Sequence, residues 1–490
     1  MAQDGVNGVG KGLVVFTDTS IVCAMNEDIP ATHCVIPDGP RRRLLLEDCD
    51  DGRRLPTLAW TLDGWSAMAV KEIGLRIGGR FGLDVTVLRD LGQSGQRYWC
   101  EVEVHGGEPT RGHWVPISEL VDLTRLAEAD RTVLESWLRE ASGAPAPPTR
   151  SPWERPGWHA EAVVWIREQL ADLGLQANGP IRQFKAAWSW SCLLEVPTTS
   201  GQLFFKAVYD KPPGEVDLIL ALQPRWAQCL PRLLAADERG WMLMENFDGE
   251  PIEKMAPERW VAAASRFGQL QMDCAVAVDE WLGMGCPDRR LCRLPALFAE
   301  VLADEDILLS DPEPLTAAEM AGLRTLQPVV GELCAKLSTY DIPESLHHQD
   351  FRSGNLIAIG DEALFYDWGD TVVSHPFLSL QRMLDFVDRP RGVPHWDWEM
   401  KHRGDRLCRA IRDAYLKEWT CLESPRRLTE VHILSRQLNV AYQAIRWHQE
   451  IPHVELDSGW GRVMPRATKN SLRQVLEIWP CLRPDKPLHS

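Results

Sequence analysis

Two kinds of hydrophobic pattern share the region before residue 141. Short apolar runs at residues 13–16 and 98–102 predict strands, and apolar positions at helical spacing predict helices at 68–80 and 132–140. This first region is therefore expected to form a small α/β domain over residues 10–140.

A proline-rich segment separates this region from the rest of the chain. Residues 141–156 read ASGAPAPPTRSPWERP, and prolines with small polar residues are not expected to build a core. The segment is therefore predicted to be a linker.

The remainder begins with strands and ends with helices. A helix is predicted at 158–173, and the strand-like segments after it end in residues 203–208. A helix-like stretch at 215–222 and a strand at 241–244 lead into a mostly helical C-terminal part. Strands first and helices later predict an α+β fold in which a small sheet-rich lobe packs on a larger helical lobe. The two lobes are expected over residues 157–246 and 247–490.

Composition and charge narrow the class of protein. The chain has 490 residues and a formal net charge of −17, which argues against a general nucleic-acid binder and is compatible with a cationic substrate. Its thirteen cysteines contain no Cys-x-x-Cys pair, which indicates scattered reduced thiols. No signal peptide or membrane-spanning apolar stretch is evident, so we expect a cytoplasmic protein without a membrane partner.

The strongest chemical pattern lies in residues 346–370, which read LHHQDFRSGNLIAIGDEALFYDWGD. Two apolar strands at 356–359 and 363–366 flank a Gly-Asp turn and predict a hairpin. A hairpin brings its ends together, so Asn355 and Asp367 are expected to meet. An amide oxygen beside a carboxylate suits Mg²⁺, a hard cation that takes oxygen ligands and keeps few protein ones.

Asp350 precedes this hairpin by a few residues. It can reach a substrate hydroxyl held in line with the γ-phosphate of a nucleotide, and phosphoryl transfer needs little more than such a base, a metal and positioning. Arg352 could stabilise charge on the transferring group. The alternative is an ordinary hairpin with polar residues at its ends.

The motif His348-x-Asp350-x-x-x-x-Asn355 followed by Asp367-Trp368-Gly369-Asp370 resembles the catalytic loop and metal-binding triplet of the aminoglycoside phosphotransferase and choline kinase superfamily. That superfamily shares the protein-kinase fold. The resemblance implies that Asp350 is the catalytic base, that Asn355 and Asp367 hold Mg²⁺, that His348 braces the loop, and that ATP is the phosphoryl donor.

The same resemblance assigns the ATP-binding half. Lys206 lies in an apolar strand and would contact the α- and β-phosphates while pairing with a helix glutamate, for which Glu215 is the first choice and Asp217 the second. The alternative is a solvent-facing lysine and an acid at a helix N-terminus, where the helix dipole favours it.

Two further segments are candidates for binding the nucleotide. The strand and hinge that hold adenine correspond to residues 241–249, with backbone groups near Glu245 and Phe247. The loop over the phosphates departs from the glycine-rich kinase pattern and offers Ser189 and Ser191 instead. An ordinary polar turn explains these serines equally well.

The first domain resembles the Nudix fold. Residues 69–73 and 81–85 echo the Nudix helix and its following turn, and 113–120 echo the closing segment. The positions where a working Nudix helix needs metal-binding glutamates hold Gly79 and Arg80. We therefore expect a non-hydrolytic domain with a structural, ligand-sensing or dimerising role, the alternative being an unrelated α+β domain.

The leading functional hypothesis is transfer of the ATP γ-phosphate to a hydroxyl of a small molecule, aminoglycoside-like or otherwise amino-bearing. A catalytically inactive nucleotide-binding sensor, a protein kinase and a bifunctional hydrolase–kinase are the alternatives. Acidic and aromatic residues after the metal motif are candidates for the acceptor pocket, although each is also explained by a helix surface or core: Asp385, Asp388, Trp396, Asp397, Trp398 and Glu399.

Overall fold

The computed structural model describes residues 29–49, 52–62, 70–94, 97–120, 128–186, 190–208, 214–385, 387, 406–456 and 459–479. The strand predicted at 13–16 lies outside these residues. None of the cysteines among these described residues is in a disulfide bond. No helix in the described ranges is long and apolar enough to cross a membrane.

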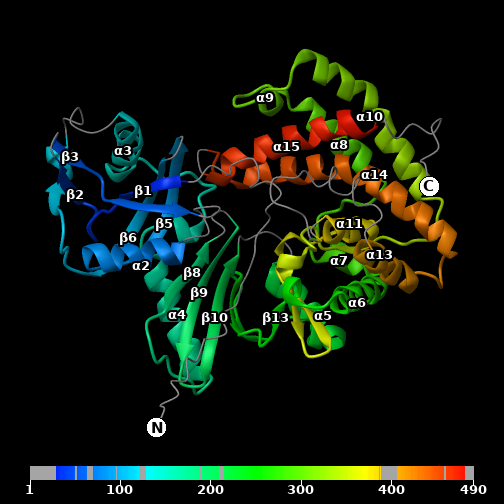
Figure 1. Cartoon of the computed structure of the whole chain (residues 1–490), viewed down its shortest axis with the longest axis horizontal. Coiled ribbons are helices and arrows are strands. Elements are labelled where there is room, and N and C mark those ends of the chain that lie inside the picture. Colours follow the sequence, from blue (N-terminus) through cyan, green and yellow to red (C-terminus); the bar gives the residue numbers. More distant parts are fainter. Residues whose placement is uncertain are drawn as a thin grey trace, which may run out of the picture.

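The N-terminal part is built on two small sheets, drawn in blue to teal in Figure 1. One sheet has the order β4-β1-β6-β5, with β1 and β6 parallel, and the other has the order β3-β2-β7. The strands are β1 Ile29–Val35, β2 Arg43–Cys49, β3 Gly52–Arg54, β4 Thr57–Leu62, β5 Leu83–Ser94, β6 Arg97–Gly107 and β7 His113–Pro116. The helices are α2 Val70–Phe81, η2 Ile117–Glu119 and α3 Glu128–Ala141, so the helices predicted at 68–80 and 132–140 are confirmed.

Helix α2 shows how the sequence determines the buried face and the end of a helix. Val70, Ile73, Ile77 and Phe81 are buried and recur at helical spacing, so one stripe of α2 faces the core. The helix stops because Gly82 adopts φ +74° and its N–H bonds the carbonyl of Gly78, as in a glycine C-cap. The Nudix-like character of this part stays a prediction.

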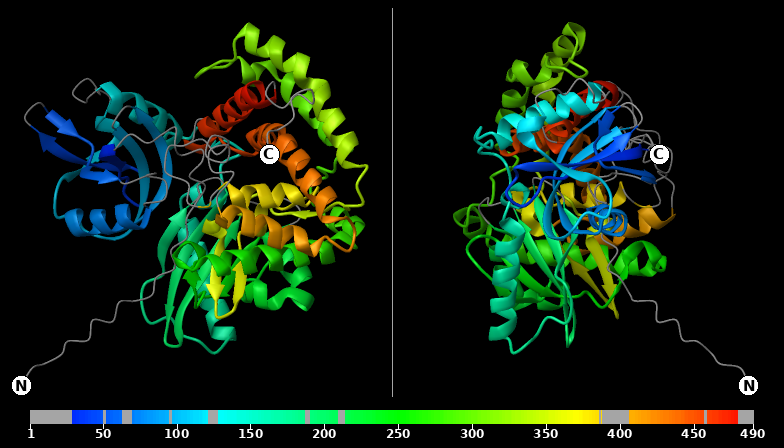
Figure 2. Two further views of the ribbon diagram at one scale, coloured as in Figure 1. Left: turned by 45° about the vertical axis from the view of Figure 1, so that its right-hand side comes forward. Right: turned by 90° about the vertical axis from the view of Figure 1, so that its left-hand side faces the viewer.

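A five-stranded antiparallel sheet of order β11-β12-β10-β9-β8 follows. Side chains alternate across β10: Leu203, Phe205 and Ala207 pack towards α4, and Phe204 and Val208 pack towards α5. Helix α4 covers the outer face (Figure 2). The elements are η4 Pro152–Glu154, α4 Trp158–Asp172, β8 Arg182–Ala186, β9 Ser191–Thr198, β10 Gly201–Val208, α5 Glu215–Trp226, η5 Ala227–Cys229, β11 Leu233–Ala236 and β12 Trp241–Glu245.

The rest of the chain is mainly helical, so the α+β prediction is confirmed. Its helices are η6 Ile252–Lys254, α6 Pro257–Ala275, α7 Val278–Gly283, α8 Leu294–Ala303, α9 Glu305–Leu308, α10 Ala317–Leu337, η7 Ser353–Asn355, η8 Trp368–Asp370, α11 Phe377–Leu384, α13 Arg406–Glu418, α14 Pro425–Glu450, η9 Ile451–His453 and α15 Gly459–Ile478. Its short strands are β13 Glu250–Pro251, β14 Ser345–His347, β15 Leu356–Ile359, β16 Glu362–Phe365 and β17 Val372–Ser374. One large hydrophobic core joins this lobe to α5.

The N-terminal part shares a core with the last two helices. Apolar side chains of α2, β5 and β6 pack with those of α14 and α15, among them Trp447 and Met464. In Figure 1 the orange and red helices α14 and α15 extend towards the blue elements. The first and last segments of the described chain are therefore held together by hydrophobic packing.

Polar contacts reinforce this boundary. Gln183 exchanges two hydrogen bonds of 2.9 and 3.0 Å with the backbone of Val87. The second half of the predicted linker is partly buried: Trp153 belongs to the core under α4, and Arg150 binds carboxylates of both Glu140 and Glu455. The proline-rich composition of the segment did not predict this.

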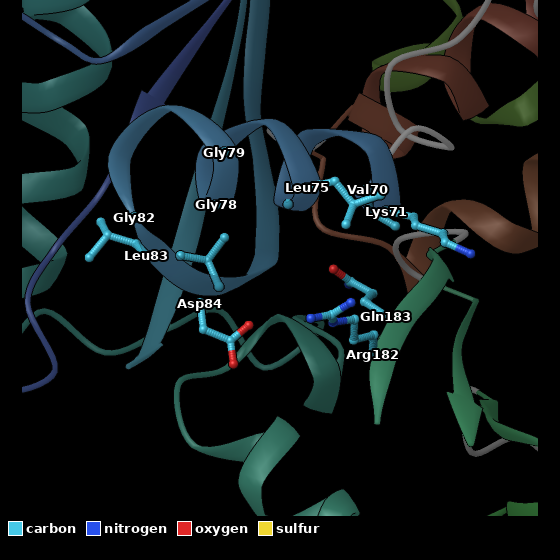
Figure 3. Close-up of a pocket in the computed structure, with 12 residues that line it drawn as sticks. Val70, Lys71, Leu75, Gly78, Gly79, Gly82, Leu83, Asp84, Arg182 and Gln183 are labelled. Carbon is cyan, nitrogen blue, oxygen red and sulfur yellow. The ribbon is translucent and has the colours of Figure 1, made fainter. Parts of the chain in front are cut away.

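A cavity of about 510 Å³ lies at the same boundary, between α2 and the start of β8 (Figure 3). Glycines of α2, together with Lys71, Asp84 and Arg182, line it. Lys71 is already bound to Glu195 across the boundary at 2.6 Å. Because its other charged side chains, Asp84 and Arg182, are exposed, the cavity offers no buried charged group to a ligand.

Candidate active site

Lys206 lies at the centre of a buried ion cluster. It is on the same face of β10 as Phe204 and Val208, so its side chain points towards α5 and the helical lobe. Its Nζ bonds Glu215 Oε2 at 2.6 Å and Asp367 Oδ1 at 2.7 Å. Burial opposes the charge, but Asp367 and Glu215 outweigh it and raise the pKa of Lys206, which stays protonated. One cation thus joins the sheet, helix α5 and the metal motif.

Glu215, the first choice for the partner of Lys206, is in that place at the start of α5. It is buried, and it also accepts a 3.2 Å bond from the backbone N–H of Trp368. Desolvation raises the pKa of Glu215, and Lys206 opposes that shift. The second choice, Asp217, is not among the described side chains that bond Lys206.

The loop carrying Asp350 is fixed by His348. The ring Nδ1 accepts from the backbone N–H of Asp350 at 3.3 Å, and Nε2 lies 3.0 Å from the carbonyl of Tyr366. A carbonyl only accepts, so Nε2 carries the proton. Burial lowers the pKa of His348 and keeps the ring neutral. His348 therefore joins the loop to the hairpin.

The hairpin forms where the sequence predicted it, with Leu356 opposite Phe365 and Ile359 opposite Glu362. The backbone N–H of Tyr366 bonds the carbonyl of Asn355 at 3.2 Å, which closes the open end. Asp367 follows at once, with φ +68° in the left-handed region. The two predicted metal ligands are thus brought to one end of the hairpin.

The side chain of Asn355 is oriented by Asp350. Its Nδ2 donates to the backbone carbonyl and to Oδ2 of Asp350, both at 2.9 Å. Its Oδ1 is buried and has no hydrogen-bond partner within the described ranges. An oxygen left in this state beside the half-exposed carboxylate of Asp367 fits a hard cation such as Mg²⁺. No group of three His, Cys, Asp or Glu side chains in the described ranges could hold a metal ion, so this candidate depends on the asparagine.

Two arginines hold the carboxylate of Asp350. Arg352 Nε lies 2.8 Å from Oδ2, and Arg382 Nη2 from helix α11 lies 3.1 Å from Oδ1. Burial favours the neutral acid, but Arg352, Arg382 and Arg446 outweigh it and hold the pKa of Asp350 well below its usual value. Asp350 is therefore ionised near neutral pH. The expected contact of Arg352 with phosphate stays a prediction.

The other predicted nucleotide residues are placed as follows. Ser191 is buried at the start of β9, opposite Val208, and Ser189 lies outside the described residues. Glu245 ends β12 and pairs with Arg232 at 2.9 Å. The ring of Phe247 packs against Tyr366, with centroids 5.2 Å apart. Their nucleotide contacts stay predictions.

Five of the six predicted acceptor residues lie outside the described residues: Asp388, Trp396, Asp397, Trp398 and Glu399. Asp385 is buried at the end of α11, where its Oδ1 accepts from Gln381 at 2.8 Å.

The structure adds residues that the sequence reasoning missed. Gln349 donates from Nε2 to the carbonyl of Asp370 at 2.6 Å, and its Oε1 accepts from Tyr442 at 2.9 Å and from Arg289. Arg446 of α14 lies 3.3 Å from Asp370 Oδ2 and donates to the carbonyl of Gln349. Arg382 could have been found from the sequence, because it is a polar residue inside the apolar stretch of α11. Nothing in the sequence around Arg289 or Arg446 indicates that they lie at the site.

In the N-terminal part, Arg80 does not face an open metal site. It bonds Glu47 at 2.8 Å and the carbonyl of Thr57 at 2.8 Å, while Gly79 lines the cavity of Figure 3. The cation at this position is thus part of the packing of the domain.

The sequence matches no protein-family model and no curated protein. Solved structures do resemble it in arrangement. A choline/ethanolamine kinase family protein from Mesorhizobium loti is 14% identical, covers 64% of this chain and 95% of its own, and has a TM-score of 0.42. Choline kinase from Cryptosporidium parvum is 14% identical, with 66% and 96% covered and a TM-score of 0.44. Aminoglycoside phosphotransferase APH(3'')-Id from Streptomyces rimosus is 17% identical, with 56% and 98% covered and a TM-score of 0.32.

At identities of 17% or less and TM-scores below 0.5, these likenesses concern the arrangement of the chain and say nothing of what it acts on. In the molecule itself, a five-stranded antiparallel sheet with its lysine–glutamate pair meets a helical lobe that carries the Asp350 loop and the hairpin.

Proposed function

We propose that the chain transfers the γ-phosphoryl group of ATP to a hydroxyl group of a small molecule. The observation that carries the proposal is the cluster that joins Lys206, Glu215 and Asp367 through bonds of 2.6 and 2.7 Å. A cation held between a helix glutamate and a metal-motif aspartate is the arrangement that positions nucleotide phosphates in kinase-like sites.

In this proposal Lys206 holds the phosphates, and Asn355 Oδ1 and Asp367 hold Mg²⁺. The metal supplies neutralisation of the charge on the phosphate oxygens. The hydroxyl oxygen forms a bond to the γ-phosphorus while the bond from that phosphorus to the bridging oxygen breaks, and ADP leaves. The hydroxyl proton goes to Asp350.

The low pKa of Asp350 shapes its role. Two arginines keep the carboxylate ionised and oriented, but they also make it a weak base. We infer that Asp350 mainly orients the hydroxyl and receives its proton late, which suits the loose transition state of phosphoryl transfer.

The test measures ADP release from ATP and Mg²⁺ with a panel of aminoglycosides, amino alcohols, nucleosides and sugars. The family resemblance favours the amino-bearing compounds. Asp350→Asn should keep ATP-induced stabilisation and lose about 10²-fold or more of the transfer rate. Asp361→Asn, at the exposed hairpin turn, is the matched control and should retain activity. Stabilisation by ATP without turnover would support the nucleotide-binding sensor, and absence of both would refute the kinase proposal.

We further propose that the N-terminal part is a non-hydrolytic, structural domain of Nudix-like fold. Arg80 is tied to Glu47, and α2 contributes its apolar stripe to the core shared with α14 and α15. Incubation with nucleoside diphosphate sugars and Mg²⁺ should release no hydrolysis product, and any Mg²⁺-dependent product would contradict this proposal.

A further inference from the structure

Arg289 is a buried cation that forms no ion pair with a carboxylate of the described residues. Its side chain is on the segment between α7 and α8, and the residue is 3% exposed. The other buried arginines of the described ranges, Arg89, Arg150, Arg352, Arg382 and Arg446, each form an ion pair with an aspartate or glutamate. Arg289 instead bonds the neutral amide oxygen of Gln349 and lies over the ring of Tyr442.

This arrangement is energetically incomplete. Arginine does not deprotonate in proteins, and a buried charge is ordinarily paired because its desolvation is costly. Arg289 Nε is buried and has no hydrogen-bond partner in the part of the chain that the structure describes. An anion at this place would supply the missing charge and the missing acceptor.

The position of Arg289 is fixed by the same elements that fix the catalytic loop. Its backbone N–H bonds the carbonyl of Val373 at 2.9 Å, and Ser374 Oγ bonds its carbonyl at 2.7 Å. Gln349, which it binds, directly precedes Asp350 in the chain. The guanidinium is therefore held beside the base rather than on a mobile surface loop.

A second arginine and a histidine lie close to Arg289. Arg446 bonds the carbonyl of Gln349 at 3.2 Å and Asp370 at 3.3 Å, so it lies on the same stretch of loop. His347 Nε2 is buried and also has no hydrogen-bond partner among the described residues. Burial, together with Arg446 and Arg289, lowers the pKa of His347, so the ring is neutral and adds no charge of its own.

The residues that hold this cluster come from the helical lobe. Gln349 is held by Tyr442 of α14 and by the segment before α8, both in the helical lobe, whereas Lys206 belongs to the sheet. The phosphates of the nucleotide are assigned to Lys206, Asn355 and Asp367. The helical-lobe side is left for the acceptor.

We propose that Arg289 and Arg446 bind an oxyanion group of the acceptor, a phosphate ester or a carboxylate, and that the acceptor is thus an anionic hydroxyl compound. The proposal deepens the kinase function and rests on it for the identity of the ligand as acceptor. It departs from the amino-bearing acceptor that the net charge and the family resemblance favour.

The direct test measures anion binding in the full chain with the nucleotide site filled. Melting temperature is followed in saturating Mg²⁺ and a non-hydrolysable ATP analogue, while sodium sulfate replaces sodium chloride at constant ionic strength. Wild type should gain about 2 °C or more with a saturable, millimolar dependence. Arg289→Gln should bind sulfate about tenfold more weakly or worse, since a charge-assisted contact is lost.

Arg290→Gln is the matched control. It removes the same charge one residue away, where Arg290 pairs with Asp288 at 2.9 Å, and should respond to sulfate like wild type. Equal saturable stabilisation of Arg289→Gln and wild type would overturn the proposal, and so would its absence from wild type. If Arg289→Gln does not fold, Arg446→Gln takes its place, and the wild-type titration still decides.

Acceptor assays then separate the chemical sources. Glucose 6-phosphate, gluconate, glucose and glucosamine are compared by ADP release, with the KM of each in wild type and Arg289→Lys. Preference for either anionic compound supports the proposal and tells a phosphate ester from a carboxylate. Turnover of glucosamine but of neither anion would overturn the acceptor assignment while leaving the kinase function intact, whereas absence of ATP-induced stabilisation and turnover would refute the kinase function itself.

Discussion

Replacing Lys206 by methionine tests how the buried ion cluster is held together. The change keeps the length of the side chain but removes the charge that faces Glu215 and Asp367 at 2.6 and 2.7 Å. Asp367 is 43% exposed and stays hydrated, but Glu215 is 2% exposed at its side chain and loses its counter-charge. The loss of folding stability is therefore expected to come mainly from Glu215.

The magnitude follows from the burial of Glu215. Leaving one member of a buried ion pair uncompensated costs about 3–5 kcal/mol. An unfolding entropy of about 2.1 cal/mol/K per residue over 490 residues gives roughly 1 kcal/mol/K, so Tm should fall by about 3–5 °C. Because desolvation raises the pKa of Glu215 and Lys206 no longer opposes it, the loss should be largest at high pH, where the folded variant must keep a buried carboxylate ionised.

The assay is thermal unfolding of wild type and Lys206→Met between pH 5 and pH 8.5. Adding Glu215→Gln to the variant removes the buried charge and should recover most of the loss at pH 8.5. Lys254→Met, which breaks an exposed pair with Glu250, should change the stability by less than about 0.5 kcal/mol. A Lys206→Met protein that is equally destabilised at every pH, or not at all, would refute this reasoning.

Further predictions concern the metal site, the shared core and a buried acid. Asn355→Ala should raise the Mg²⁺ concentration needed for half-maximal ADP release at least tenfold, and an unchanged Mg²⁺ titration would remove Asn355 from the metal site. Met464→Ala should cost about 2–5 kcal/mol in chemical denaturation, and a loss below 0.5 kcal/mol would contradict the shared core. Burial raises the pKa of Glu154 from its usual value of 4.5 to about 8. The free energy of unfolding should therefore fall as the pH rises from about 4.5 to 8, because the unfolded chain loses this proton first. Wild type should therefore lose stability over that range more than Glu154→Gln does, which differential scanning calorimetry would show.

The parts of the site that the sequence predicted are those encoded locally. Asp350, Asn355 and Asp367 lie within one loop and hairpin, so spacing and turn chemistry place them without tertiary information. Lys206 was recognisable as a charge inside an apolar strand whose next helix begins with Glu215. The loop and hairpin needed only neighbours along the chain, whereas the pairing of Lys206 with Glu215 came from the family resemblance.

The parts that the sequence did not predict depend on packing between distant segments. Arg289 and Arg446 reach Gln349 from a connection and from α14, and no periodicity links them to Asp350. The apolar stripe of α2 was visible as a helix face, but the rest of its core, which includes Met464, was not. A hydrophobic pattern shows that a face is buried and does not show what it packs against. The burial of Trp153 was not predicted because prolines and small polar residues dominate the segment around it.

The core shared between α2 and the last two helices has a consequence for how the chain is made. As synthesis proceeds from the N-terminus, the apolar residues of β5 leave the ribosome long before Met464 of α15, the helix that packs against this strand, is translated. This part of the core cannot close until α15 has emerged. A fragment cut within 141–156 would keep an uncovered apolar surface on both halves, so neither half should accumulate as a stable, monodisperse protein when expressed by itself.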